Sequence, residues 1–391
     1  MLQSIHGQTF TAVRTSLLTV LFSCLTVFLF ANENGEENKK FNAGELIIEH
    51  VADNHSWHVW GGEKDGMSMP LPVILYNPER GFTCFMSNHF HHGDMTYAGY
   101  KLHHGKIVAV NETGSIPAEM ATENEELTNS TYDISITKNV AALLFSLALM
   151  VWVFISVARS YGRRKGEAPK GMQSLFEPLI VFVRDDIAKA SIGPKYYKYM
   201  PYLLTVFFFI WINNLLGLIP ILPGGANVTG NIAVTGTLAV ITFVITCFSA
   251  NKAYWRHVFA MPGVPWPVLF ILTPIEILGV FLRPFVLMIR LFANIAAGHI
   301  IALSFFSLIF IFGEISSIAG WSVSIVSVAF VIFMSMLELL VAFLQAYVFT
   351  LLSAIYFGAA QEEHNHQHDE NNHEEHPHFN PDRHIAEAAL V

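Results

Sequence analysis

Two apolar segments near the C-terminal end of the chain carry ionisable side chains whose natural chemistry is proton transfer. They are Glu276, Arg283, Arg290 and His299 in residues 268–312, and Glu338 in residues 321–357. A charged side chain at the centre of a bilayer costs about 2.5–3.5 kcal/mol on insertion scales, so ionisable residues in such segments are candidate functional residues. These five residues therefore predict a site that handles charge inside a membrane.

The spacing of these residues separates them into different environments. Glu276, Arg283 and Arg290 are seven residues apart, so on a helix they share one stripe that drifts by only about 20° per step. His299 is nine residues beyond Arg290, about 180° around the helix, and faces another neighbour. A plain alternative is that Arg283 reaches an interface and pairs with Glu276. That alternative does not account for Arg290, which lies near the middle of its segment.

A fixed cation in low dielectric can control the protonation of a partner acid. The guanidinium group of Arg290 does not give up its proton, but it stabilises the ionised form of a nearby carboxyl group. A protonated carboxyl group that approached it would be driven to release its proton. Glu276, His299 and Glu338 can titrate or order water, so they could line separate wet paths to the two sides of the membrane.

The composition indicates that membrane helices position these residues. The chain has 391 residues, of which 53% are hydrophobic and only 14% charged, whereas soluble domains carry about 25% charged residues. The net charge is −9, and no basic block is present, which argues against nucleic-acid binding. The three cysteines form no CxxC pair, so neither a disulfide framework nor a structural zinc site is expected.

The expected fold is an all-α integral membrane protein with about five spans and an amphipathic interfacial helix. Two long tilted helices lie at its C-terminal end, and a small β-rich exported segment lies at its N-terminal end. An apolar span at 140–157 is followed by basic residues, which places its C-terminal end in the cytoplasm. Residues 199–251 contain no charge, and a turn-rich stretch at 220–231 divides them into two spans. Residues 268–312 would form a helix of roughly 68 Å, so they must tilt steeply or turn back within a hydrocarbon layer of about 30 Å.

Four regions follow from this pattern. Residues 1–31 resemble a secretory signal, with an uncleaved anchor as the alternative. Residues 32–133 form an exported, histidine-rich, β-rich segment, in which exposed polar histidines are favoured over a metal site. Residues 134–361 are the membrane domain, with residues 175–189 as its amphipathic helix. Residues 362–391 are an acidic, histidine-rich tail that we expect to be disordered and cytoplasmic.

Three motifs resemble subunit a of the rotary F-type ATP synthase from bacteria. Residues 283–299 read RPFVLMIRLFANIAAGH and match the family signature in register. The sequence NLLGLIP at 214–220 resembles the motif of the second span, and LQAYVF at 344–349 resembles that of the last helix. The resemblance covers roughly residues 134–361. It does not extend to the exported segment or the tail.

The resemblance implies a stator subunit that catalyses no bond chemistry itself. It would provide two proton half-channels to a rotating ring of c subunits, so that ion flow drives rotation and ATP synthesis. The implied partners are the c-ring, a b-type peripheral stalk, the other synthase subunits and membrane lipid; no cofactor, metal or nucleic acid is expected. The implied location is the bacterial inner membrane, with the N-terminal segment periplasmic or extracellular. Sodium remains an alternative ion.

The resemblance also assigns roles to single residues. Arg290 corresponds to the essential arginine that attracts the deprotonated ring carboxylate and prevents a short circuit between the two paths. Glu276 matches a carboxylate near the cytoplasmic path, and Asn294 and Gln345 match polar residues beside the arginine.

Two further residues match the pair that lines the path from the far side, namely His299 and Glu338. Some relatives carry an acid at the position of Gly217, so this chain would depend more on that pair.

Two other classes of protein fit the sequence less well. A histidine-rich divalent-metal transporter would use the many histidines, but it requires several inward-facing ligands in neighbouring spans, and residues 200–248 offer none. An intramembrane protease requires a nucleophile or a metal motif such as HExxH, which the sequence lacks.

Overall fold

The computed structural model describes residues 44, 47, 53–60, 67–103, 105–163, 168–219, 225–261 and 263–361. The expected signal at 1–31 and the tail at 362–391 lie outside these residues. Within the described part, the expected fold class is confirmed: small β-sheets precede a helical region with five helices long and apolar enough to cross a membrane.

The N-terminal part consists of three small antiparallel sheets. The largest has the strand order β4–β3–β7, and its alternating residues Val73, Leu75 and Phe85 join a core with Phe90 and Tyr100. The strands pair β1 with β2, β3 with β4 and β7, and β5 with β6. Their bounds are β1 Ser56–Trp60, β2 Met67–Pro70, β3 Pro72–Asn77, β4 Gly81–Met86, β5 Tyr100–His103, β6 Lys106–Ala109 and β7 Tyr132–Asp133, and the short helices are η1 Ser87–Gly93, η2 Ala118–Met120 and α3 Glu125–Asn129.

The expectation of exposed histidines is wrong for His55. Its side chain is buried, and its Nε2 lies 3.2 Å from the Oδ2 of Asp133 on β7. The contact with the carboxylate offsets the free-energy cost of burying this polar ring. The described side chains of His89, His91 and His103 are exposed, as expected.

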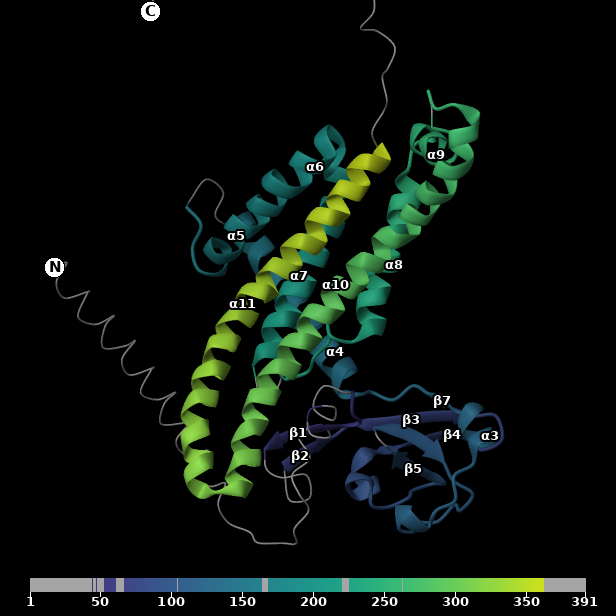
Figure 1. Cartoon of the computed structure of the whole chain (residues 1–391), viewed down its shortest axis with the longest axis vertical. Coiled ribbons are helices and arrows are strands. Elements are labelled where there is room, and N and C mark those ends of the chain that lie inside the picture. Colours follow the sequence, from purple (N-terminus) through teal and green to yellow (C-terminus); the bar gives the residue numbers. More distant parts are fainter. Residues whose placement is uncertain are drawn as a thin grey trace, which may run out of the picture. The chain divides into compact units, whose positions relative to one another are not determined.

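Five long helices form the membrane domain. Helices α10 and α11 run side by side (Figure 1), α11 also packs on α7, and α10 on α8. The centre of this packing is α7, where Leu203, Phe207 and Ile210 are fully buried. The bounds are α4 Lys138–Arg163, α7 Met200–Leu218, α8 Ile232–Ser249, α10 Trp266–Ile315 and α11 Ser317–Gln361.

Helix α10 is one uninterrupted helix of 50 residues that contains Pro274 and Pro284. Of the two options for this segment, turning back is therefore wrong, and a helix of about 75 Å must tilt or project beyond the hydrocarbon layer. The expected connecting loop at 313–320 is also too long, because α10 ends at Ile315 and α11 begins at Ser317. Glycine explains this tight turn: a Cβ on Gly320 would lie 2.8 Å from the Cα of Gly313.

The amphipathic stretch folds as α5 Met172–Phe182, a π-helical turn η3 Val183–Lys189 and α6 Ala190–Ile192. Among the apolar residues spaced at i+4 in this stretch, Val183 and Ile187 are buried, whereas Leu175 is exposed and its neighbour Phe176 is buried. A row of i+4 positions drifts by about 40° per step on a helix of 3.6 residues per turn, which moves Leu175 off the buried face. The remaining short helices are η4 Gly193–Lys198 and α9 Lys252–Phe259.

Candidate functional site

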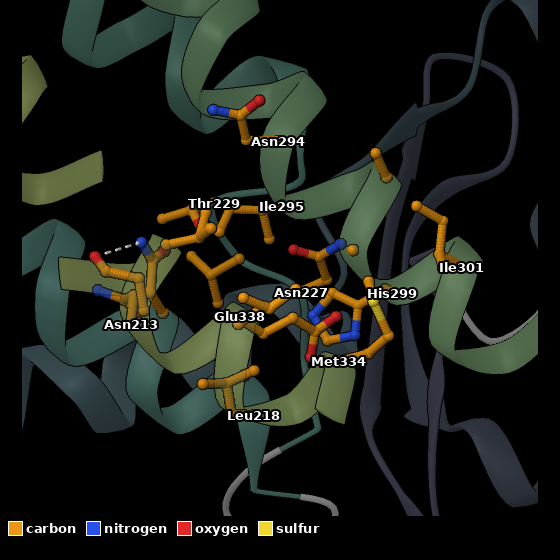
Figure 2. Close-up of a pocket in the computed structure, with 18 of the residues that line it drawn as sticks. Asn213, Leu218, Asn227, Thr229, Asn294, Ile295, His299, Ile301, Met334 and Glu338 are labelled. Carbon is orange, nitrogen blue, oxygen red and sulfur yellow. Dashed lines mark hydrogen bonds between the residues drawn. The ribbon is translucent and has the colours of Figure 1, made fainter. Parts of the chain in front are cut away.

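A cavity of about 290 Å³ lies among α7, the segment that follows it, α10 and α11. Most of its lining residues are apolar, but several are polar, among them Asn227, Thr229, His299 and Glu338, which Figure 2 labels. His299 of α10 and Glu338 of α11 lie next to each other on one side of the cavity. The volume is sufficient for several water molecules, and the polar groups could hold them. The cavity therefore contains a titratable pair and room for a water path.

The carboxyl group of Glu338 is unusual in its surroundings. Its Oε1 is buried and has no hydrogen-bond partner within the described residues. Buried polar atoms without partners are rare in folded proteins, and they call for water, an ion or a functional role. The predicted association of His299 and Glu338 is thus consistent with the geometry, because both side chains reach the same cavity from different helices.

Two glycines keep the space around this pair open. A Cβ on Gly298 would lie 2.7 Å from the Oε1 of Glu338, closer than nonbonded atoms approach, and a Cβ on Gly217 would lie 3.9 Å from the Nε2 of His299. The same Cβ on Gly217 would lie 3.4 Å from the backbone oxygen of Ala226, so a side chain at this position would enter the space beside the histidine. Gly298 has a more direct effect, since it determines where the carboxylate of Glu338 can sit.

Arg290 is outside the cavity. Its side chain is exposed on the isolated chain, while Leu287 and Leu291 on either side of it are buried in the helix packing. Its backbone is held in place, because the buried Gln345 of α11 donates a hydrogen bond from Nε2 to the carbonyl oxygen of Arg290 at 2.6 Å. The structure thus brings Gln345 to Arg290 and directs the guanidinium group outward.

The other predicted residues occupy separate positions along α10. Asn294 is one turn beyond Arg290 and exposed; it borders the cavity, but Figure 2 shows its amide directed away from it. Glu276 is partly exposed and lies 14 residues before Arg290, which is about 21 Å along the helix axis. The residues on α10 therefore form a series along the helix and not one compact cluster.

Arg283 has partners that the sequence did not indicate. It donates from Nη1 to the hydroxyl oxygen of Tyr254 at 3.2 Å, and its guanidinium carbon lies 5.7 Å from the centre of the Tyr356 ring. The alternative in which Arg283 pairs with Glu276 is therefore wrong for this structure, since no ion pair between the two occurs among the described residues.

Buried amides next to the cavity were also missed. Thr229 donates to the Oδ1 of Asn214 at 2.5 Å, and Asn214 donates to the backbone oxygen of Ala342 on α11 at 3.3 Å. Asn213 and Asn227 are buried as well and line the cavity. Two adjacent asparagines in an otherwise apolar span were the signal that could have identified them. Within the described residues, no group of three or more His, Cys, Asp or Glu side chains could hold a metal ion.

The fold and the site define a class: a multi-span membrane protein whose helices line a mainly apolar cavity that contains titratable side chains, with a fixed cation on an adjoining helix surface. A comparison with family models gives the family. The model described as ATP synthase A chain matches residues 140–358, which is more than half of the chain, and the chain belongs to this family. A second model, described as a domain of unknown function (DUF8433), matches residues 46–134.

Individual relatives agree with the family match. The chain is 50% identical over 236 residues to "ATP synthase subunit a 2" of Chlorobaculum tepidum, covering 59% of this chain and 64% of the relative. It is 45% identical to "ATP synthase subunit a" of Chloroherpeton thalassium, covering 59% and 67%, and 40% identical to the protein of that name from Anaeromyxobacter sp., covering 60% and 56%. The chain thus spans about two thirds or less of the length of these relatives.

Proposed function

We propose that this chain is the proton-conducting stator subunit of an ATP synthase, which provides two half-channels to a rotating ring of c subunits. The observation that supports this most strongly is the arrangement of α10 and α11. Their shared cavity holds His299 and Glu338, while their outer surface presents Arg290, whose backbone is fixed by Gln345. A proton path and a fixed cation therefore lie on the same pair of helices.

His299 and Glu338 are proposed to line the path from the side of the N-terminal segment. Water in the cavity would link them, because His299 and Glu338 line it together with polar side chains such as Asn227 and Thr229 that can hydrogen-bond to water. The buried Oε1 of Glu338 has no hydrogen-bond partner among the described residues. Such water would supply a hydrogen bond to it, or the transferred proton would bind there. The pair then accepts a proton from one side and passes it toward the ring.

Arg290 is proposed to act on the ring and not within its own subunit. An exposed guanidinium group in hydrocarbon is costly, so the surface around it requires a partner with negative charge. A ring carboxylate meets this need, because Arg290 stabilises its ionised form and cannot itself carry the proton onward. Asn294 lies one turn away on the same surface, and Glu276 would border the path on the cytoplasmic side. The driving force is about 2.3 kcal/mol per charge per 100 mV.

The proposed complex also contains a b-type peripheral stalk and the other synthase subunits, and its location is the bacterial plasma membrane. Arg159, Arg163 and Lys170 follow the first span, and basic residues favour the cytoplasmic side. This places the β-rich segment outside the cytoplasm and the C-terminal tail inside. The chain itself catalyses no bond chemistry.

Replacing the fixed cation tests the proposal. In Arg290→Ala, ATP-driven proton pumping and ATP synthesis in membrane vesicles are expected to be lost, while the detached catalytic head continues to hydrolyse ATP. The matched control is Arg159→Ala, which removes an exposed arginine at the end of α4 and is expected to retain coupling. Normal synthesis rates in Arg290→Ala, at a normal level of assembled protein, would reject the assignment.

A further inference from the structure

The sheet β4–β3–β7 has an apolar outer face that its own core does not use. The inward residues of β3 and β4 fill the core, and the alternate residues point the other way. The register aligns these outward residues across all three strands, with Tyr76 opposite both Phe82 and Tyr132, and Ile74 opposite Cys84. We call this set the outer sheet face: Pro72, Ile74, Tyr76, Phe82, Cys84, Met86, Tyr132, Ile134 and Ile136.

None of these nine side chains is charged, and the largest are well exposed. Phe82 is 69% exposed, and Tyr132 and Ile134 are each 64% exposed. An antiparallel sheet with one face in water normally places polar residues on that face. A contiguous apolar patch that remains exposed marks a surface that contacts something other than water.

The position of the outer sheet face in the chain indicates what it contacts. Pairing with β3 continues beyond β7, because Ile134 donates its N–H to the oxygen of Ile74 at 2.9 Å and Ile136 donates to Pro72 at 3.0 Å. The first span, α4, begins at Lys138. Four residues of chain reach at most about 14 Å, so Ile134 lies within that distance of the start of a membrane helix.

The attachment between sheet and span is also rigid. Asp53, just before β1, accepts hydrogen bonds from Thr137 Oγ1 at 2.8 Å and from the N–H of Asn139 at 3.0 Å. Asn54 accepts another from the N–H of Lys138 at 2.9 Å. These three bonds join the first residues of the span to the segment before β1. The bonds of Ile134 and Ile136 to β3 tie the same stretch of chain to the sheet, so sheet and span are connected by hydrogen-bonded chain and not by a free linker.

We propose that the outer sheet face lies in the headgroup layer of the membrane, on the side where α4 begins, with its apolar and aromatic side chains inserted among the lipids. The polar layer on each side of the hydrocarbon is about 5–8 Å thick, which a rigid sheet joined to the span can reach. Tyrosine suits this layer because its ring is apolar and its hydroxyl group is polar. With no cationic side chain on the face, contact depends on apolar burial and not on anionic lipid.

Native Cys84 allows a direct test, because it is exposed and lies within the outer sheet face. In the full chain, with Cys24→Ser and Cys247→Ala, a nitroxide attached to Cys84 would be studied after reconstitution with native lipids and any subunits that copurify. Collision rates with oxygen, which partitions into lipid, and with a water-soluble nickel chelate would be compared. Labels at other positions are placed in chains that also carry Cys84→Ser. The matched control is a label at Lys106→Cys, an exposed site on the β5–β6 hairpin, which packs against the opposite side of the sheet.

The two sites are expected to give opposite results. At Cys84 the collision rate with oxygen exceeds that with the nickel chelate, and at Lys106→Cys the order is reversed. A label at Ile134→Cys is expected to follow Cys84, since it lies nearer to the span. Nickel-dominated collisions at Cys84 would mean that the face is in water, and low collision rates with both reagents would mean that a protein or another segment of the chain covers it. Either outcome would overturn the proposal, whether or not the chain conducts protons.

Discussion

At the scale of single residues, the proposed function depends on a glycine as much as on the titratable side chains. Gly298 leaves the volume in which the Oε1 of Glu338 sits, because any Cβ there would lie 2.7 Å from that oxygen. A side chain can move away from such a contact without unfolding the protein. The consequence of adding a methyl group should therefore be a displaced carboxylate and not a disrupted fold.

Gly298→Ala is accordingly expected to lower proton conduction while leaving the amount of folded protein unchanged. Misplacing a reacting group by about 1 Å can cost up to a hundredfold in rate, and we expect a loss of roughly ten- to hundredfold. The measurement is ATP-driven acidification of membrane vesicles. The control is Gly279→Ala on the same helix, where a Cβ meets no atom within 4 Å. Equal pumping by both variants would show that the position of Glu338 is not critical.

Another residue-scale contact links the stability of the β-segment to pH. Burial by itself raises the pKa of Asp133, but hydrogen bonds from His55 and Ser135 outweigh it, so the pKa lies below its usual 3.8. A depressed carboxyl pKa stabilises the folded state above the unfolded pKa, and this contribution is lost as the pH falls through the folded value.

Asp133→Asn is therefore expected to be less stable than the native chain at neutral pH and to differ less from it below about pH 4. Hydrogen exchange of the β3 amides in the full chain measures this difference. Asp94→Asn provides a comparison, since Asp94 has no ion pair within the described part of the chain. A stability difference that is the same at all pH values would contradict the role of the Asp133 charge.

At the scale of elements, the hairpin of α10 and α11 holds the site together. The hairpin turns within a few residues because Gly320 has no Cβ, so its backbone can lie close to the Cα of Gly313. The same pair of helices, further along, joins Gln345 to the backbone of Arg290 and Glu338 to the cavity of His299. A substitution at the tip that moved the two helices apart would therefore also disturb the contact of Gln345 with Arg290 and the cavity that holds Glu338.

Gly320→Ala is expected to destabilise the hairpin, since its Cβ would lie 2.8 Å from the Cα of Gly313, and backbone cannot move aside as a side chain can. Overpacking of this kind typically costs about 1–3 kcal/mol. The check is the midpoint of thermal unfolding in detergent. Gly313→Ala serves as the control, because a Cβ at Gly313 meets nothing within 4 Å. An unfolding midpoint as high as that of the control would argue against close contact at the tip.

At this scale the positions of the spans could be predicted from the sequence, but the exact ends of helices and turns could not. The first three spans are visible as apolar runs, because burial in lipid selects such runs, although α4 extends beyond the expected 140–157 to Lys138–Arg163. The turn after α10 is shorter than expected, because glycines are usual in loops, whereas here the missing Cβ of Gly320 lets the ends of two helices approach each other.

At the scale of the whole molecule, the exposed side of α10 is the surface that requires a partner. Arg290, Ala293 and Asn294 are exposed there, while the residues that hold the fold together lie on the other side. The proposed partner is the c-ring, since its carboxylate would neutralise the arginine.

A cysteine at Ala293 is therefore expected to form cross-links with c subunits in native membranes. Its control is Leu144→Cys on α4, which is equally exposed on the isolated chain but is expected to face lipid. The products would be identified by mass spectrometry after oxidation of a paired cysteine in the c subunit. If only Leu144→Cys were cross-linked to c subunits, the ring would have to pack on another surface.

The sequence by itself determined the class of fold, the order of the spans and the register of Arg290 in its signature, because these depend on hydropathy and on neighbours along the chain. Only the tertiary structure decided that His299 and Glu338 share a cavity, that Gln345 holds the backbone of Arg290, and that Arg283 contacts tyrosines in place of Glu276. Contacts between helices depend on their rotation and axial offset. Those quantities are set by packing among residues far apart in the sequence, which no local pattern records.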